Sequence, residues 1–447
     1  MPSRSLTRWP LPLAEVSEQL LPPDAAFLVH DEGMQNFAEE FVQSPKLVDV
    51  RYDVRGPIAQ EAARLERAGH RITRLNIGNP APFGFEAPEQ ILRHMIKTLP
   101  TAQGYSDSQG VYSARVAVAQ YYQARGLRGA APEDVWLGNG VSELISMVLT
   151  ALIAPKDEIL IPAPDYPLWT GATKLAGGNP VHYICDEDNH WWPDPEEIES
   201  KVTERTKALV LINPNNPTGA VYPREILEAM VDICRRHNLM LLADEIYEKI
   251  IFDGAEMVNA ATLSDDVLTI TFSGLSKTWR VAGFRSGWIY ISGPRHRAKN
   301  YIEGLNLLMN MRMCANVPAQ HAIQAALGGY QSIEELILPK GRLYEQSRTA
   351  HRLLSEIEGV TVEKSDGALY LFPRLDPELY PIDDDEAFVI ELLRQKKILL
   401  SHGRAFNWED TQHIRVVTLP HVEDLEVAIS EIADFLADYR DVATRTG

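Results

Sequence analysis

A lysine that follows an apolar run is the first candidate for chemistry in this sequence. Lys277 closes the segment Thr269–Lys277, whose first residues read as a β-strand. Lysine at a strand end is most often solvated. Here Arg280 and Arg285 follow closely, and neighbouring cations depress a lysine pKa, which suits Schiff-base chemistry. A solvated strand end and a placed amine both remain open from this segment alone.

Two further charged residues stand beside apolar strands. Asp244 ends the run Leu239–Ala243, where a carboxylate is costly unless it is paired. It is either half of a structural salt bridge or the counter-ion of a protonated ring nitrogen. Arg415 lies in the apolar segment His413–Leu419, and an arginine there favours a carboxylate that it can hold in a fork. That carboxylate belongs to a ligand or to an acidic side chain.

Three loops have the residues that a flat, phosphorylated ligand would need. Gly138–Ser142 follows a strand and opens a helix, so its backbone suits a phosphate. The dinucleotide fingerprint is incomplete, because Glu143 replaces its third glycine. Tyr166 stands among prolines that could hold its ring against a ligand, and Asn213–Gly219 is an amide-bearing turn. An ordinary turn, core packing and a rigid loop are the respective alternatives.

Composition and motifs exclude several classes. The 447 residues include 62 acidic and 43 basic ones, a net charge of −19, which disfavours sequence-independent nucleic-acid binding. The longest apolar stretch, Leu144–Pro155, is far short of the ~20 residues of a membrane span. Motifs for metals, phosphate transfer and serine hydrolysis are missing. Cys185, Cys234 and Cys314 form no disulfide or zinc pattern, and we expect a cytoplasmic protein.

The elements that must position these residues alternate between strands and helices. Continuous apolar runs separated by helical patterns predict an α/β fold with a mostly parallel central sheet covered by helices. Ligands of such folds bind outside the carboxyl ends of the strands. Five of the runs end in polar loops, which predicts one pocket on one rim. The runs are 135–137, 158–161, 208–212, 239–243, 268–272 and 287–291.

The chain ends predict further units. Helical patterns at 341–356, 385–396 and 421–437 alternate with short strands at 360–363, 368–372 and 413–418, which indicates a smaller α+β domain. Helices are also expected from residue 51 and over 88–98 and 111–125. We expect an N-terminal arm of unknown role at 1–47, a small domain from 48–99 and 331–447, and a large domain at 100–330.

Together these segments resemble the class I, fold-type I aminotransferases that use pyridoxal 5′-phosphate. The resemblance covers roughly residues 50–440. It is carried by Asn215–Gly219 (Asn-Asn-Pro-Thr-Gly), by Asp244–Tyr247 (Asp-Glu-Ile-Tyr), and by Ser276-Lys277 with Gly-Phe-Arg285 after it. Other stretches are most similar to the bacterial glutamate–pyruvate (alanine) aminotransferases: 52–57, 75–84, 139–145, 162–169 and 314–321.

The resemblance implies roles at the cofactor ring. Lys277 would carry the cofactor as a Schiff base, and Asp244 would keep the pyridine nitrogen protonated. Tyr247 and Asn216 would hydrogen-bond the ring's phenolic oxygen, and Tyr166 would stack on the ring.

The resemblance also implies phosphate and substrate contacts. The phosphate would be held by the backbone of Val141 and Ser142, by Ser276 and Arg285, and by Tyr105 from a second subunit, which implies a homodimer with shared active sites. The substrate α-carboxylate would be bound by Gly78, Asn216 and Arg415, and the distal carboxylate of glutamate by Tyr52 and Arg55. No metal is implied.

One departure from the family pattern concerns the phosphate. Many members have serine three residues before the lysine, where this chain has Gly274, with Ser273 one position earlier. One hydroxyl of the phosphate cup is therefore in question.

The implied activity is amino transfer between alanine or pyruvate and glutamate or 2-oxoglutarate, by a ping-pong mechanism. A C–S lyase of the same fold and an aminotransferase for another amino acid are alternatives. A regulator with this fold would need a DNA-binding domain, for which residues 1–47 are too short and too rich in proline. Lys277, Arg285, Arg415 and Arg55 predict a positive hollow in an acidic protein.

Overall fold

The computed structural model describes residues 43–47, 50 and 56–446. The chain divides into two compact units, 1–44 and 45–447. The fold below is that of the second unit, and the arm expected at 1–47 lies almost entirely outside the described residues. None of the helices in the described part of the chain has the length and apolar character of a membrane span.

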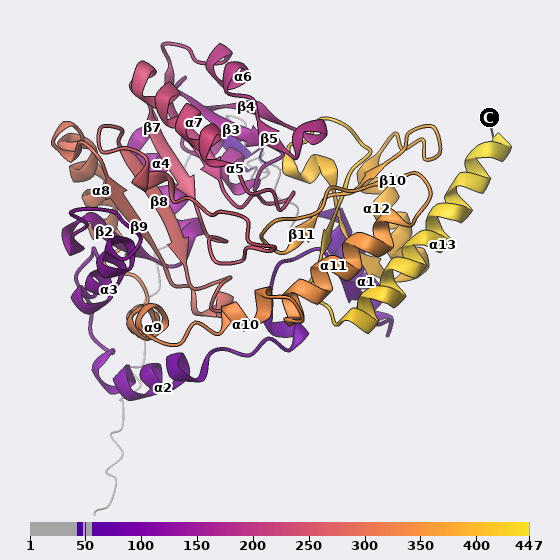
Figure 1. The fold of residues 1–447 in the computed structure, drawn as a ribbon, viewed down its shortest axis with the longest axis horizontal. Coiled ribbons are helices and arrows are strands. Elements are labelled where there is room, and N and C mark those ends of the chain that lie inside the picture. The colour runs from indigo at the N-terminus through magenta and orange to yellow at the C-terminus, as the bar shows by residue number, and fades with distance from the viewer. Residues whose placement is uncertain (1–42, 48–49, 51–55, 447) are drawn as a thin grey trace, which may run out of the picture. The chain divides into compact units, whose positions relative to one another are not determined.

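An eight-stranded sheet forms the centre of the larger half of this unit (Figure 1). Its order is β2-β9-β8-β7-β6-β3-β4-β5. β8, β7, β6, β3 and β4 pair in parallel, whereas β9 is antiparallel to both its neighbours and β5 is antiparallel to β4. The strands are β2 (Val135–Gly138), β3 (Glu158–Ala163), β4 (Asn179–Asp186), β5 (Trp192–Pro193), β6 (Thr206–Ile212), β7 (Met240–Asp244), β8 (Thr269–Gly274) and β9 (Gly287–Ser292).

The predicted mostly parallel sheet is confirmed, and its six predicted runs match six strands within a few residues. β4 and β5 were not predicted. β4 begins with Asn179 and Pro180 and contains His182, and only two of its eight residues are fully buried. It therefore lacks the continuous apolar run that marked the other strands.

Helices cover both faces of this sheet because successive side chains of a strand point to opposite faces. Val210 of β6 packs in the cluster that includes Leu149 and Leu305, from α4 and α8. Its neighbour Leu209 packs in the cluster that includes Met230 of α7. The helices of this half are α2 (Glu89–Thr98), α3 (Tyr112–Gln123), α4 (Val141–Leu152), α5 (Leu168–Leu175), α6 (Pro195–Ser200), α7 (Arg224–His237), α8 (Lys299–Met311) and α9 (Val317–Gly328).

Three small sheets form the other half. β15 (Ile414–Val417) lies between β11 (Tyr370–Leu371) and β14 (Ser401–His402). The two-stranded sheets are β1 (Thr73–Arg74) with β13 (Ile398–Leu399), and β10 (Val360–Thr361) with β12 (Arg374–Leu375). The helices here are α1 (Pro57–Arg67), α10 (Ile333–Ile337), α11 (Arg342–Ser355), α12 (Asp385–Lys396) and α13 (Val422–Thr446).

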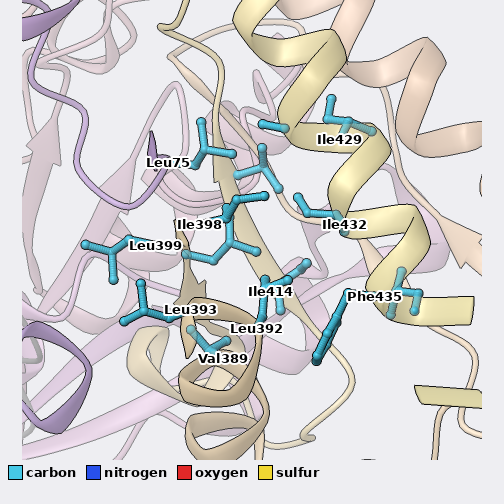
Figure 2. Packing of buried hydrophobic residues seen from close by; sticks show 14 of the residues in the cluster. Leu75, Val389, Leu392, Leu393, Ile398, Leu399, Ile414, Ile429, Ile432 and Phe435 are labelled. Atoms are coloured by element: carbon cyan, nitrogen blue, oxygen red, sulfur yellow. The ribbon is translucent and has the colours of Figure 1, made fainter. Parts of the chain in front are cut away.

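One apolar core holds most of these smaller elements together (Figure 2), whereas Ile333 of α10 packs in a separate cluster with Tyr370. Ile429, Ile432 and Phe435 of α13 face Ile414 of β15 and Leu392 of α12 in that core. The helix was predicted to end at residue 437 but continues to Thr446. The sequence contains no glycine or proline between residues 421 and 446 that would end the helix. The last turns are also tied to the domain, because the Tyr439 hydroxyl donates to the Pro381 carbonyl at 3.1 Å.

Two separate apolar clusters show which segments pack with the smaller half and which with the larger. Residues 58–75 and 350–436 share the core of Figure 2. Ile91 of α2, in contrast, packs in a cluster that includes Val118 of α3 and Ile323 of α9. The boundaries expected at 99/100 and 330/331 stay a prediction.

Candidate active site

One cavity of about 350 Å³ lies at the carboxyl ends of the central strands. Residues that follow five of the strands line it: Val141 and Ser142, Tyr166, Asn216, Ile246 and Tyr247, and Ser276 and Lys277. Its charged lining residues are Lys277, Arg285, Arg415 and Asp244, so three cations face one carboxylate. The smaller half contributes residues from four separate segments: Asn76, Ile77, Gly78, Tyr370, Ser401, Ala405, Phe406 and Arg415.

The amine of Lys277 lies inside this cavity. It donates a hydrogen bond to the carbonyl oxygen of Gly78 at 2.7 Å and lies 5.6 Å from the centroid of the Tyr247 ring. Arg280 does not line this cavity, because its guanidinium binds the Glu86 carbonyl and the Ser332 hydroxyl. Of the two arginines that follow the lysine, only Arg285 is therefore part of the site.

Asp244 ends β7 with 3% of its surface exposed. Its carboxylate accepts hydrogen bonds from the indole N–H of Trp169 at 3.2 Å and the backbone N–H of Ile246 at 3.3 Å. Burial raises the pKa of Asp244 to about 6, although the Trp169 bond and the charge of Lys277 oppose the shift. Both donors are neutral, so a cationic ligand group is the partner that would relieve the burial of this charge.

Arg415 and Asn216 come from opposite sides of the cavity and meet. Arg415 lies on the central strand of its small sheet, and its Nη1 donates to Asn216 Oδ1 at 2.9 Å. Its Nη2 donates to the carbonyl oxygen of Asn76. The guanidinium lies 4.5 Å from the Tyr370 ring centroid and 4.4 Å from that of Phe406. These contacts hold the guanidinium of Arg415 in one orientation.

The start of α4 forms the end of the cavity that suits a phosphate. Gly140 precedes the helix with φ 83°, and Val141 and Ser142 begin it. First-turn N–H groups have no partner within a helix. Arg285 Nη2 donates to the Asn139 carbonyl at 3.3 Å, and a side chain at Gly140 would collide with that guanidinium.

Glu143, the residue that broke the dinucleotide pattern, has a structural role. Its carboxylate accepts from the backbone and amide nitrogens of Asn139 at 2.7 and 2.9 Å and pairs with Arg312. The glutamate therefore shapes the loop in place of a third glycine.

Other predicted residues fall both inside and outside this site. Tyr166, Tyr247 and Ser276 line the cavity. Tyr105 does not line it and has 81% of its surface exposed. Tyr52 and Arg55 lie outside the described residues.

Sequence reasoning missed several lining and supporting residues. Tyr370 lines the cavity with its hydroxyl 2.6 Å from that of Tyr247, and Phe406 lines it beside Arg415. Trp169 supports Asp244 from outside the lining. The only signal was position, since Trp169 stands three residues after Tyr166 and Tyr370 lies in a predicted strand. Aromatic residues in such places are indistinguishable from core.

Gly274 and Ser273 show why the family serine is missing here. A Cβ at Gly274 would lie 2.8 Å from the Ser286 carbonyl oxygen and 3.0 Å from the Cα of Gly287, on the paired strand β9. The hydroxyl of Ser273 donates instead to the buried Glu248 carboxylate at 3.2 Å. Neither residue lines the cavity, whereas Ser276 does.

We expect Gly274→Ser to lower the free energy of unfolding by about 1–3 kcal/mol, because β9 must move to accept the side chain. Denaturant titration of the purified protein measures this loss. Gly283→Ser is the control, because a Cβ at Gly283 meets no atom within 4 Å. Equal stability of the Gly274 variant and the wild type would contradict the steric argument.

Asp165 joins the loop that carries Tyr166 to the segment 406–407 of the smaller half. Its carboxylate accepts from the Asn407 amide at 2.7 Å and the Thr170 hydroxyl at 2.8 Å, and its N–H donates to the Phe406 carbonyl at 2.9 Å. Thr170 Oγ1 also lies 2.9 Å from His182 Nε2. Burial raises the pKa of Asp165 to about 7, against the effect of these hydrogen bonds.

This raised pKa predicts a pH effect on stability. The contribution of Asp165 to the free energy of unfolding is fully present below its unfolded pKa of 3.8, and it is lost as pH rises through about 7. An asparagine at this position can keep both side-chain bonds: its amide oxygen accepts from Asn407, and its amide nitrogen donates to the Thr170 hydroxyl. Thr170 must then donate to His182, which can accept because burial lowers the pKa of that histidine to about 4. We therefore expect Asp165→Asn to remove roughly 3 kcal/mol of the stability loss between about pH 5 and about pH 8. Unfolding curves with the same pH dependence in both proteins would refute this.

Comparison with known proteins identifies a single family. The family model described as aminotransferase class I and II matches residues 71–432. A glutamate–pyruvate aminotransferase AlaA of Haemophilus influenzae is 57% identical over 90% of this chain and 99% of its own length. An alanine aminotransferase of Mycobacterium tuberculosis is 60% identical over 90% of this chain and 94% of its own length.

Solved structures agree with this comparison. The crystal structure of an aminotransferase from Escherichia coli superposes with a TM-score of 0.89 and 56% identity, covering 90% of this chain and 99% of that one. An alanine aminotransferase from Pyrococcus furiosus has a TM-score of 0.84 and 34% identity, covering 89% of this chain and all of that one.

Proposed function

This chain belongs to the class I and II aminotransferases, and from that premise we propose that it moves an amino group between L-alanine or pyruvate and L-glutamate or 2-oxoglutarate. The observation that carries the proposal is the arrangement around Asn76–Gly78. The Lys277 amine binds the Gly78 carbonyl at 2.7 Å, and the Arg415 guanidinium binds the Asn76 carbonyl. The segment Asn76–Gly78 thus holds both the Lys277 amine and the carboxylate-binding guanidinium of Arg415 in the same cavity.

Enzymes of this family depend on pyridoxal 5′-phosphate, and we propose that this chain binds it in the cavity described above. The buried Asp244 suits a protonated ring nitrogen, and Lys277 is the amine that would hold the aldehyde carbon. The ring would lie against Tyr166, with Asn216 and Tyr247 near its phenolic oxygen. When bound, this cofactor supplies an electron sink that stabilises negative charge on the substrate Cα.

The proposed phosphate contacts come from another part of the cavity lining. The free N–H groups of Val141 and Ser142, the hydroxyl of Ser276 and the cation of Arg285 all line it. A helix start with a neighbouring arginine is a suitable environment for a dianionic phosphate.

Each protein group then has a defined task. Arg415, with Asn216 and Gly78, would bind the substrate α-carboxylate and orient Cα toward the Lys277 amine. That amine would remove the proton from Cα and return it to the cofactor carbon to which Lys277 had been attached, two atoms away across the substrate nitrogen. Asp244 would keep its charge throughout, since it faces the ring nitrogen. In the second half of the cycle a 2-oxo acid would occupy the same contacts.

We further propose that the active enzyme is a homodimer. Tyr105 is exposed, and so are apolar side chains of two helices, Ile96 of α2 at 73% and Met311 of α8 at 74%. The Ser108 hydroxyl donates to Asn310 Oδ1 at 2.6 Å, which joins the loop after Tyr105 to α8. The family resemblance implies that Tyr105 of a second copy would reach the phosphate.

We also propose a binding site for the distal carboxylate of glutamate and a location in the cell. Tyr52 and Arg55 are assigned to that carboxylate on the family resemblance alone. A cytoplasmic location agrees with the three cysteines, which form no disulfide.

The test uses purified protein with pyridoxal 5′-phosphate and a panel of amino donors. Alanine with 2-oxoglutarate should yield pyruvate and glutamate, and the reverse reaction should proceed with the same enzyme. Faster transfer from another amino acid would overturn the assigned substrates. Pyruvate release from cysteine without any 2-oxo acid would indicate the eliminating alternative.

A further inference from the structure

Tyr370 is a buried tyrosine of β11 that contacts three parts of the active site at once. It retains only 2% of its surface and lines the cavity. Its hydroxyl lies 2.6 Å from that of Tyr247, and the two rings meet edge to face at 5.7 Å. It also lies so close to Gly78 that any side chain there would overlap its hydroxyl.

The register of the small sheet directs the Tyr370 ring toward Arg415. Tyr370 pairs with Val417 across β11 and β15. Arg415 stands two residues before Val417, so its side chain is on the same face of the sheet, diagonal to Tyr370. The ring reaches the guanidinium at 4.5 Å, and Phe406 covers it from 4.4 Å. The arginine is thus in cation–π contact with two aromatic rings.

The hydroxyl contact constrains the direction of a hydrogen bond. A hydroxyl has one hydrogen to donate and two lone pairs to accept with. If Tyr247 donates to the cofactor's phenolic oxygen, as the proposed function requires, it must accept from Tyr370. Phenylalanine in place of Tyr370 would leave Tyr247 without that donor.

We propose that Tyr370 is a positioning residue for amino transfer: its hydroxyl directs the hydrogen of Tyr247 toward the cofactor, and its ring fixes the fork of Arg415. This inference rests on the proposed function and adds a residue to its site. The two tasks use different parts of one side chain, so different substitutions separate them.

The charges around Tyr370 make its hydroxyl sensitive to pH. Burial raises the pKa of Tyr370, but the nearby Lys277 and Arg415 cations and the Tyr247 hydrogen bond outweigh burial and lower it. The pKa of Tyr247 is raised well above its usual value by burial and by Tyr370. Tyr370 is therefore the first of the pair to ionise, and the Tyr247 hydrogen then turns toward it and away from the cofactor.

The experiment compares Tyr370→Phe and Tyr370→Leu with the wild-type enzyme. With Phe, we expect kcat to fall about tenfold with KM for alanine changed by less than about twofold, because the ring still holds Arg415. With Leu, KM should also rise about tenfold because the cation–π contact is lost. The alkaline limb of the kcat profile should move to higher pH in the Phe variant.

A second readout needs no turnover. Alkaline titration of the cofactor-free protein, followed by tyrosinate absorbance, should lose its earliest-ionising tyrosine in Tyr370→Phe. Tyr380→Phe is the matched control, since Tyr380 has 1% of its surface exposed but donates to the Glu358 carbonyl and does not line the cavity. It should leave kcat, KM and the earliest ionisation unchanged.

The outcomes separate this inference from the proposed function. Wild-type kcat, pH profile and titration in Tyr370→Phe would overturn the role of the hydroxyl. An unchanged KM in a folded Tyr370→Leu variant would overturn the role of the ring. A wild-type protein that transfers no amino group would refute the proposed function, and the titration would still decide whether Tyr370 ionises first.

Discussion

Lys277→Ala is expected to lower kcat for amino transfer by about 10⁴-fold or more, because one side chain serves both as covalent attachment point and as proton carrier. The remaining cavity would still offer Arg415 and the α4 N-terminus to the ligands. Binding should therefore weaken less than turnover. Steady-state kinetics and the visible spectrum of the protein mixed with pyridoxal 5′-phosphate measure both quantities.

Two substitutions sharpen this test. Lys277→Arg keeps a cation beside the Gly78 carbonyl but lacks an amine that can form the covalent bond, and it should be as inactive as alanine. Lys249→Ala is the control, because Lys249 binds Gln331 at 2.6 Å and does not line the cavity. Turnover by either Lys277 variant at more than a hundredth of the wild-type rate would exclude the lysine from both tasks.

Asp244→Asn should produce the second-largest loss, about 10²–10³-fold in kcat. The charge opposite the ring nitrogen is what makes the proposed cofactor an effective electron sink, and a preorganised charge in a buried site is worth several kcal/mol. The Trp169 indole can still donate to the amide oxygen, so the fold should survive. Cofactor affinity should change less than kcat, since Asp244 is not one of the proposed phosphate contacts.

Asp165→Asn is the matched control for this prediction. Asp165 is also a buried aspartate on the same rim, but it bonds to Asn407 and Thr170 and does not line the cavity. Its variant should keep kcat close to wild type. Equal losses in both variants would mean that a general change in this rim, and not the charge of Asp244, limits turnover.

The net charge of −19 gave no guidance about the pocket. The cavity carries Lys277, Arg285 and Arg415 against one carboxylate, which suits ligands with a phosphate and a carboxylate. Acidic residues elsewhere account for the total. A charge count therefore predicts that nucleic acid is not a partner, which stays a prediction, and it could not describe a cavity whose charge comes from four side chains.

Several site residues were predictable because their chemistry is unusual for their place in the sequence. A lysine, an aspartate and an arginine at strand ends or within apolar strands are costly. The strand–loop pattern put Lys277 and Asp244 on a common rim, whereas Arg415 was expected in the smaller domain. Tyr370, Phe406 and Trp169 carried no such cost. Aromatic side chains are ordinary in strands and helices, so their role became visible only through distances to Tyr247, Arg415 and Asp244.

The sequence by itself determined the alternation of strands and helices, the rim on which the polar loops gather, and the residues with the strongest chemical signal. Only the tertiary structure decided the contacts among them. Lys277 meets Gly78 across 199 residues, and Tyr247 meets Tyr370 across 123. Local patterns report burial and periodicity, whereas such pairings depend on how sheets and helices pack. The same reason explains Gly274, whose missing side chain is dictated by the backbone of a strand that follows it.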